Sequence, residues 1–425
     1  MKIHKPIVFL PVESTRRELD YKLNLARYFC KKKFDVIIGN PAFIRDELKY
    51  RNYQSIFLEK GLNPDPGYYK MLSDKGIYLY DLGDEGAADP IYNLDYPLTV
   101  KALRYMRSIF LWGKIQKDRL IDKNKDKKFK KKYKIVGNPA FDLSTIKYKK
   151  FYRNLNSEIL PKKFILINTN FSACMGYNLE EHLKACTLIS PLSIESMKAS
   201  YVQEAKEFIS FREWLESLFT SFPKETFLIR PHPCENQQKY EEIFNKYPNV
   251  IISKKGNVNE AISRAKILIH KDCTTAMQGY LAGIPVISFS KGLSHESQGW
   301  SLEFGTIPKT FKEAKKMLSD LLDEKKWPDK IQNKIDLNAK QIIDENFYNI
   351  GHSTKDIVDF ITDDAKSLLK SKFPYNLKNS RTLLQKAKFF IRRFLPLHYN
   401  LDVFTSDTMS KFTKKELLKK LDLFE

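Results

Sequence analysis

Two short polar segments hold the residues whose types and spacing suit phosphate chemistry. The first is Arg230 to Pro233, with His232 between two prolines, and it follows the apolar run 227–229. The second runs from His270 to Thr275 and follows the apolar run 267–269. Arginine, histidine and threonine side chains donate hydrogen bonds to phosphate oxygens. The sequence therefore predicts an anion-binding site made by these two segments.

The local backbone is expected to hold these groups firmly. Pro231 and Pro233 fix φ on both sides of His232 and disfavour helix, so the imidazole is placed on a stiff, extended corner. Thr274 and Thr275 are predicted to begin a helix, where free N–H groups and the positive end of the dipole receive an anion. Arg230 and Pro233 complete this predicted phosphate-contacting set.

An acidic turn in the first half of the chain is the other candidate for chemistry. Asp84 and Glu85 follow a predicted strand, and Gly86 gives the turn the freedom to bring a carboxylate into a cleft. Such a carboxylate would act as a general base. The alternative interpretation is a solvated acidic turn without a catalytic role.

The elements that must position these residues alternate between strand and helix. In the first half, strands are expected at Ile7 to Val12 and over 34–39, 56–58 and 77–80, and a strand that runs into a turn is expected over 135–142. Ser14 or Thr15 together with Glu18 resembles a capping box before an amphipathic helix. Strand and helix in repetition favour a parallel α/β sheet.

The second half repeats this pattern. A strand at Phe164 to Phe171 precedes a long helix over 194–221, and two further helices are expected over 311–322 and 331–346. The polar stretch from Ser144 to Lys163 is the candidate linker. We therefore expect an α/β fold with domains at 1–150 and 151–350, followed by a helical, basic extension at 351–425.

Composition limits the classes of function. The chain has 425 residues and a net charge of +22, which fits an anionic substrate, an anionic membrane surface or a lysine-rich genome. It carries no nucleic-acid-binding motif, so nucleic acid is not an expected partner. The 5 scattered cysteines favour a reducing cytoplasm and argue against a zinc site. Apolar runs are too short to span a membrane, and the first residues lack a signal-peptide pattern.

The tail has a different pattern from the body. Apolar residues fall on one helical face and basic ones largely elsewhere, among them Lys386, Lys388, Arg392 and Arg393. A basic amphipathic helix of this type binds an anionic membrane surface. The alternative is a helix packed on the body of the protein.

Several motifs in fixed order then point to a family. They are Leu10 to Glu13 with Arg17 to Asp20, the Asp84-Glu85-Gly86 turn, Val136 to Pro139, Ile165 to Phe171, the segment Arg230 to Pro233 and the threonine pair. The chain resembles the bacterial surface carbohydrate biosynthesis proteins and, more distantly, the CMP-sugar-dependent sialyl-, polysialyl- and Kdo-transferases. The resemblance covers about residues 5 to 350. It implies a GT-B fold, with two Rossmann-like domains whose parallel sheets face each other across a cleft.

The resemblance also implies roles for particular residues. The acidic motif of the relatives falls on Asp84, Glu85 and Gly86, and its carboxylate would deprotonate the acceptor hydroxyl. The His-Pro motif falls on His232 and Pro233, whose imidazole would stabilise the leaving CMP phosphate. The hydroxyls of Thr274 and Thr275 would hold that phosphate.

Other positions depart from the family pattern or have two possible roles. Asp272-Cys273 stands where relatives tend to have Gly-Ser, and Gln278, a predicted nucleotide contact, stands where they often have Glu. Asp272 adds a negative charge near the proposed phosphate, which Lys271 or Arg230 must offset. His270 is predicted as a structural hydrogen-bonding residue or, at most, a nucleotide contact.

The resemblance implies a glycosyltransferase that moves a nonulosonate such as Kdo, sialic, legionaminic or pseudaminic acid. Its donor would be the CMP sugar, and its acceptor a surface glycan or glycolipid at the inner face of the cytoplasmic membrane. No cofactor or metal is expected, since no DxD-like pattern is present and a cationic His and Arg can replace a metal. The alternatives are a CMP-alditol-phosphate or UDP-sugar enzyme and an inactive scaffold in a glycan assembly complex.

Overall fold

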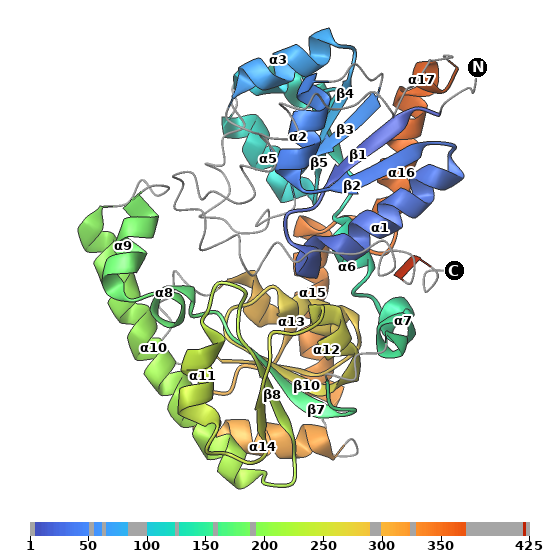
Figure 1. Cartoon of the computed structure of the whole chain (residues 1–425). Helices are drawn as coiled ribbons and strands as arrows, with labels where there is room; N and C mark the ends of the chain where they lie inside the picture. The colour runs from blue at the N-terminus through green and yellow to red at the C-terminus, as the bar shows by residue number, and fades with distance from the viewer. Residues whose placement is uncertain are drawn as a thin grey trace. The chain divides into compact units, whose positions relative to one another are not determined.

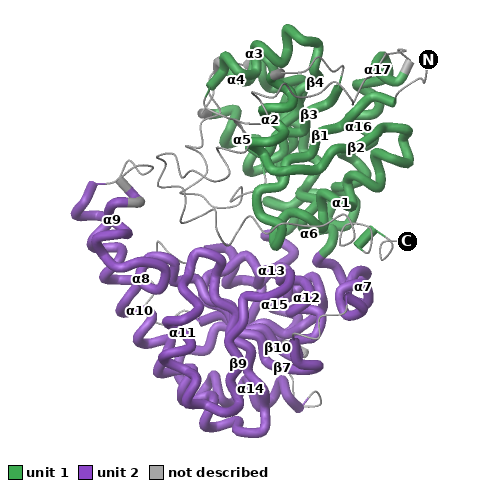
Figure 2. Tube along the Cα trace, in the orientation of Figure 1, with its two compact units in different colours: residues 1–143, 343–425 green, residues 144–342 purple. Residues whose placement is uncertain are grey.

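A computed structural model describes residues 5–50, 55–61, 65–83, 100–123, 127–155, 160–187, 193–289, 299–323, 329–370 and 420–421. The chain forms two compact units (Figure 2). Unit 1 comprises residues 1–143 and 343–425, and unit 2 comprises residues 144–342. Asp84, Glu85 and Gly86, as well as residues 371–419 of the tail, lie outside the described residues.

Unit 1 contains a parallel sheet with the strand order β2-β1-β3-β4-β5-β6. Its strands are β1 (Ile7–Pro11), β2 (Asp35–Gly39), β3 (Ser55–Glu59), β4 (Tyr78–Leu82), β5 (Ser108–Leu111) and β6 (Tyr133–Ile135). Its helices are α1 (Thr15–Lys31), α2 (Pro41–Tyr50), α3 (Pro66–Asp74), α4 (Val100–Leu103), α5 (Lys114–Lys123), η1 (Lys127–Lys132), α6 (Pro139–Asp142), α16 (Ser353–Asp364) and α17 (Lys366–Lys370).

Alternate residues of these strands face different helices, as the period of two in a strand requires. Phe9, Phe57 and Leu79 pack in one cluster with side chains of α2 and α3. The other face receives α16, which is far away in the sequence (Figure 1). Tyr80 donates to Asp364 Oδ2 at 2.5 Å, and the Phe110 and Phe360 rings lie 5.6 Å apart. Residues 353–364, assigned by sequence to a separate extension, thus pack on the sheet of unit 1.

The Val136 to Pro139 motif has a steric explanation within unit 1. Gly137 has a φ of +85°, and a β-carbon on it would lie 2.0 Å from the Tyr348 carbonyl oxygen. Only glycine tolerates both the conformation and this close approach. Asn138 is the N-cap of α6, and its side chain accepts from Ala140 N.

Unit 2 contains a parallel sheet with the order β11-β10-β7-β8-β9. Its strands are β7 (Phe164–Asn168), β8 (Phe227–Arg230), β9 (Val250–Ile252), β10 (Ala265–His270) and β11 (Val286–Ser288). Its helices are η2 (Ile146–Tyr148), α7 (Lys149–Asn154), α8 (Ser172–Gly176), α9 (Leu179–Thr187), α10 (Ile194–Ser221), α11 (Gln237–Phe244), α12 (Val258–Arg264), α13 (Thr275–Leu281), η4 (Trp300–Phe304), α14 (Phe311–Leu322) and α15 (Asp329–Asn346). The boundary between the units at 342/343 falls inside α15.

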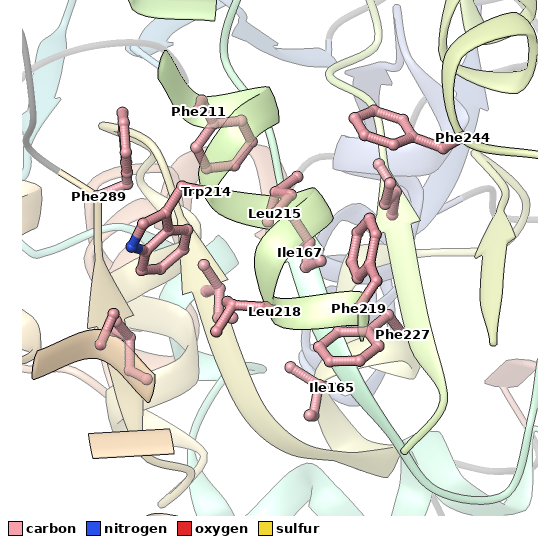
Figure 3. Packing of buried hydrophobic residues seen from close by; sticks show 14 of the residues in the cluster. Ile165, Ile167, Phe211, Trp214, Leu215, Leu218, Phe219, Phe227, Phe244 and Phe289 are labelled. Carbon is pink, nitrogen blue, oxygen red and sulfur yellow. The ribbon is translucent and has the colours of Figure 1, made fainter. Parts of the chain in front are cut away.

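The core of unit 2 lies between its sheet and the long helix α10. Phe211, Trp214 and Leu218 of α10 pack with Ile165 and Ile167 of β7 (Figure 3). Every one of these side chains is buried. Burying an aliphatic or aromatic side chain of this size contributes about 1.5–3 kcal/mol, so this layer holds the sheet on which the site is built.

The predicted α/β fold with parallel sheets is confirmed in both units. The polar stretch from Ser144 to Lys163, predicted as a linker, is instead part of unit 2. Within it, Phe151 and Tyr152 are buried, and Arg153 Nε donates to the Ser263 carbonyl at 2.7 Å. Two buried aromatic residues inside a lysine-rich segment are enough to dock it as α7 on α12.

Candidate functional site

The predicted anion-binding segments lie at the carboxyl ends of neighbouring strands in unit 2. In the parallel register, Asn168 of β7 pairs with Arg230 of β8 on one side and with His270 of β10 on the other. The chain runs outward from β7 to β8 and β9, and then crosses back to β10. The order therefore reverses between β7 and β10, and ligands of doubly wound sheets bind at such a point, outside the carboxyl ends.

His232 is held by its own loop and by the loop after β7. Its backbone N–H donates to Glu235 Oε2 at 2.8 Å, and the Cys234 N–H donates to its Nδ1 at 3.3 Å. Ser172 Oγ lies 3.1 Å from the same ring nitrogen. Because Nδ1 accepts from the backbone, the proton of the neutral ring is on Nε2. His232 is thus oriented as a donor through Nε2.

Glu235 links the two loops, a role that no sequence pattern indicated. Its carboxylate accepts from Thr169 Oγ1, from the Phe171 N–H and, at 3.1 Å, from the Tyr240 hydroxyl. It is 2% exposed. Burial raises the pKa of this carboxyl, and the hydrogen bonds that it receives oppose the rise. Glu235 therefore fixes His232 relative to the central strand.

The loop after β7 also reaches the segment after β10. Asn168 Nδ2 donates to Thr275 Oγ1 at 2.9 Å, and Asn170 Nδ2 donates to the Asp272 carbonyl at 2.8 Å. Asn168 is 3% exposed, and its Oδ1 has no hydrogen-bond partner within the described residues. Residues 168–172 thus connect the His232 loop with the Thr275 loop. The short polar side chains at the end of this strand were the only sequence signal for the role of residues 168–172.

The loop after β10 has a special backbone and a buried ion pair. Asp272 has a φ of +39°, in the left-handed region, and its carboxylate accepts from Ser301 Oγ at 2.7 Å. Lys271 Nζ lies 3.3 Å from Glu207 Oε2, and both side chains are buried. The charge of Asp272, predicted to oppose phosphate binding, is thus engaged by a neighbouring hydroxyl.

The predicted helix start after this loop is present as α13, with Thr274 as its N-cap residue. Thr274 is exposed and makes no side-chain capping bond. Thr275 is half-buried beside Cys273. Burial raises the pKa of the Cys273 thiol, and hydrogen bonding to Thr275 opposes this rise. The two threonine hydroxyls therefore stand on the side of β7 opposite to the His232 loop.

Of the two roles predicted for His270, the structure supports the structural one. The Cys273 N–H donates to Nδ1 at 3.2 Å, and Nε2 lies 2.7 Å from Ser288 Oγ, which donates to the Leu302 carbonyl at 3.2 Å. The ring is 0% exposed, and burial lowers its pKa to about 3. Both ring nitrogens are used inside the protein, so His270 is not a nucleotide contact.

Two other predicted contacts have partners inside unit 2. Arg230 donates to the carbonyls of Lys255 and Gly256 at 2.6 Å each, which anchors the loop after β9. Gln278 Nε2 donates to Ser144 Oγ at 3.1 Å and to Asn259 Oδ1 at 3.2 Å. The amide of Gln278 thus fastens the start of unit 2 to α12, a role different from the predicted contact with nucleotide.

The described part of the chain contains no group of three or more His, Cys, Asp or Glu side chains arranged to hold a metal ion. None of its helices combines the length and the apolar character that crossing a bilayer requires.

Comparison with known proteins identifies the fold. No protein-family model matches the chain, and no curated protein matches it. Among solved structures, a putative UDP-N-acetylglucosamine 2-epimerase from Listeria monocytogenes is similar with a TM-score of 0.52 and 13% identity, covering 85% of this chain and 97% of that one.

Two further structures are similar to the same extent. The UDP-GlcNAc 2-epimerase of Methanocaldococcus jannaschii gives a TM-score of 0.52 and 13% identity, over 84% of this chain and 99% of that one. The wall teichoic acid polymerase TagF gives 0.51 and 14%, over 86% and 90%. At such identities the likeness shows the fold alone. The chain has the predicted GT-B-type fold.

Proposed function

We propose that the chain is a glycosyltransferase that takes a nonulosonate-type sugar from its CMP donor and passes it to a bacterial surface glycan. One observation carries the proposal. Polar side chains from the loops after β7, β8 and β10 gather at the point where the strand order of unit 2 reverses, and Glu235 and Asn168 tie these loops together. The choice of CMP and of a nonulosonate comes from the sequence resemblance.

The roles follow from the chemistry of the transfer. The acceptor oxygen attacks the anomeric carbon, the bond from that carbon to the CMP phosphate breaks, and the acceptor proton passes to a base. His232, oriented to donate through Nε2, would stabilise the departing phosphate. Thr274 and Thr275 would hydrogen-bond its oxygens. Asp84 or Glu85 would be the base, supported by Gly86, and these residues lie outside the described part.

A second candidate keeps the site but changes the nucleotide. The structural neighbours are named as UDP-GlcNAc 2-epimerases and as TagF, one structure of which was soaked with CDPG. A UDP-sugar or CDP-linked substrate would place its phosphates at the same loops. The inactive scaffold is the third candidate and would bind nucleotide without turnover.

The test is calorimetry on the full chain with CMP, CDP and UDP. The variants are His232→Gln and Thr275→Val, and the control is His352→Gln, which removes an exposed histidine in unit 1. Losing a hydrogen bond to a charged phosphate should weaken CMP binding by about tenfold or more. The control should bind like the parent. Equal CMP affinity in all chains would place the nucleotide elsewhere, and a clear preference for UDP or CDP would favour the second candidate.

Turnover separates the enzyme from the scaffold in the same set of proteins. Asp84→Asn and Glu85→Gln should retain CMP binding, while the one that removes the base lowers turnover by about 10²–10⁴-fold. A parent chain that binds CMP but transfers no sugar to any surface-glycan acceptor would support the scaffold.

A further inference from the structure

Asn168 ends the central strand of unit 2, and its side chain leaves one buried polar atom unsatisfied. It stands at the carboxyl end of β7, where the strand order reverses, and is 3% exposed. Its Nδ2 donates to Thr275 Oγ1 at 2.9 Å, whereas its Oδ1 has no hydrogen-bond partner. No other described residue of unit 2 has a buried side-chain nitrogen or oxygen atom without a partner. An unsatisfied buried group in a folded protein requires an explanation.

The hydroxyl of Thr275 has one hydrogen to donate, and α13 does not use it. A threonine inside a helix often donates to a carbonyl oxygen three or four residues earlier. Thr220 and Thr362 donate in this way to carbonyls four residues before them, at 3.1 and 2.6 Å. Thr275 is the first residue of α13, so no carbonyl of its own helix precedes it. Within the described residues, its oxygen accepts from Asn168 and donates to no carbonyl.

The acceptor that this hydroxyl does meet in the free protein is a weak one. Thr275 hydrogen-bonds to the thiol of Cys273. Thiol sulfur accepts hydrogen bonds weakly, while the charged oxygens of a phosphate accept them strongly. Thr275 is half-buried at the edge of the sheet where ligands of such folds bind. A phosphate placed there would therefore replace the sulfur as the acceptor.

Asn168 determines how the Thr275 hydroxyl is used. A hydroxyl has one hydrogen and two lone pairs. Because Nδ2 of Asn168 donates to one lone pair, the hydrogen is directed away from Asn168, toward the thiol or toward a ligand. Ordering a group before the ligand arrives lowers the entropy cost of binding. The Thr275 hydroxyl is thus held as a donor, which suits a ligand group that accepts hydrogen bonds and donates none.

We propose that Asn168 is a positioning residue of the nucleotide site, which holds the Thr275 hydroxyl as a hydrogen-bond donor to an ionised phosphate oxygen. The inference rests on the proposed function for the nucleotide as the source of that phosphate. The site then selects an ionised phosphate, because an alcohol or an amine in its place would present a donor to a donor. It also explains the unsatisfied Oδ1: the amide is held in the direction that serves Thr275.

The test is a double-mutant cycle on the full chain, with CMP affinity measured by calorimetry. Asn168→Leu removes the donor and keeps a side chain of similar size, and Thr275→Val removes the hydroxyl and keeps the shape. Asn168→Leu alone should weaken CMP binding about three- to tenfold, as for one lost hydrogen bond. In the Thr275→Val background it should change the affinity by less than about twofold, because no hydroxyl remains to be positioned.

Asn170 supplies the matched control, because it connects the same two loops by the same kind of bond. Its Nδ2 donates to the Asp272 carbonyl at 2.8 Å and not to Thr275. Whatever Asn170→Leu does to CMP affinity through the loops, it should do equally in the parent and in Thr275→Val. If Asn168 only connected the loops, Asn168→Leu would show this same additive pattern.

Two further variants test the direction of the bond and the need for the hydroxyl. Thr275→Ser keeps the hydroxyl, so in this background Asn168→Leu should again weaken CMP binding about three- to tenfold. Asn168→Asp keeps the shape but offers only acceptors to Thr275, so it should weaken CMP binding more than Asn168→Leu does. If Asn168→Leu shows no cooperative melting transition, the cycle is run with Asn168→Asp, whose loss should likewise be smaller in the Thr275→Val background.

The outcomes separate this inference from the proposed function. If Thr275→Val weakens CMP binding but Asn168→Leu has no effect, or the same effect in both backgrounds, the positioning role is refuted and the proposed function stands. If CDP or UDP binds in place of CMP and the two residues are coupled, the CMP-sugar proposal fails and the positioning role stands. If binding of none of the three nucleotides depends on Thr275, the positioning role is refuted, because the hydroxyl then serves no phosphate.

Discussion

Among single residues, His270 gives the clearest prediction about stability and pH, because its ring is buried and neutral. Burial lowers the pKa from the ordinary value of 6.5 to about 3. Below pH 6.5 the unfolded chain binds a proton at His270 that the folded chain does not bind. The contribution of His270 to the free energy of unfolding is therefore complete above this pH and declines as the pH falls toward 3. Between pH 6.5 and 5, this residue should cost about 2 kcal/mol of the free energy of unfolding.

The measurement is urea unfolding of the parent and of His270→Gln at pH 7.5 and pH 5. The variant should be less stable at pH 7.5 and should lose about 2 kcal/mol less than the parent on acidification. His352→Gln is the control, since His352 is exposed, and it should follow the parent at both pH values. Identical acid losses in the parent and in His270→Gln would show that the ring is protonated in the folded protein.

The residues of the candidate site differ in how far the sequence could reveal them. His232 and Thr275 could be selected because their types and flanking prolines or helix start are local signals. Glu235 could not, because its role depends on contacts with Thr169 and Phe171, which are 66 and 64 residues away. An isolated glutamate in a polar stretch is ordinarily solvated, and only the fold brings the loop after β7 against it.

At the scale of elements, long periodic segments were predictable and short or charged ones were not. The helices α10 and α14 begin and end at the predicted residues, because their apolar faces repeat over many turns. The lysine-rich block before β6 has no such apolar repeat, so the contacts of its members could not be predicted. Lys132 Nζ donates to the carbonyls of Leu103, Arg104 and Met106 at 2.9, 2.9 and 2.6 Å. A lysine that caps another element looks the same in sequence as a solvated one.

Asp142 holds helix α16 on unit 1 in a way that lends itself to a test. Its carboxylate accepts from the N–H groups of Gly351, Ser353 and Thr354 at 2.7, 3.2 and 2.7 Å, and it is 1% exposed. His352, the N-cap of α16, makes no side-chain capping bond, so Asp142 satisfies the start of the helix from another part of the chain. Asp142→Asn should lower the free energy of unfolding of unit 1 by about 2 kcal/mol, since hydrogen bonds to a charged acceptor are lost.

Hydrogen exchange measured by mass spectrometry is the suitable readout, because it localises the loss. Amides of α16 should exchange faster in Asp142→Asn, while those of α10 in unit 2 should be unchanged. Asp65→Asn is the control, since Asp65 is an exposed N-cap residue of α3 whose side chain accepts from Gly67 N at 2.9 Å and which asparagine can replace. If the amides of α16 exchange equally slowly in both variants, Asp142 does not anchor this helix.

At the scale of the whole molecule, the two units share one organising principle. Each contains a parallel sheet whose strand order reverses once, between β1 and β3 in unit 1 and between β7 and β10 in unit 2. Polar and charged side chains gather outside the carboxyl ends at both reversals. Repetition of strand and helix allowed the parallel sheets to be predicted, but the order of the strands, and hence the place of each reversal, depends on long-range pairing that a single sequence does not show.

The net charge of +22 belongs to the whole chain, and its effect can be separated from that of the tail. We predict that the tail retains the protein on anionic vesicles. Substituting Gln for Lys386, Lys388, Arg392 and Arg393, which lie outside the described residues, removes four positive charges. At about 1 kcal/mol for each basic side chain near the surface, partitioning onto phosphatidylserine-containing vesicles should fall by about 10³-fold at low salt.

The matched control removes the same charge from the body of unit 2. Lys309, Lys312, Lys315 and Lys316 are exposed in and just before α14, and their substitution with Gln leaves a chain of the same net charge as the tail variant. Co-sedimentation with phosphatidylserine-containing and neutral phosphatidylcholine vesicles should show strong retention for the parent and this control on the anionic vesicles only. The tail variant should remain in the supernatant. Equal losses in both variants would mean that diffuse charge, not the tail, attracts the protein, because a field spread over the whole molecule depends on net charge and not on position.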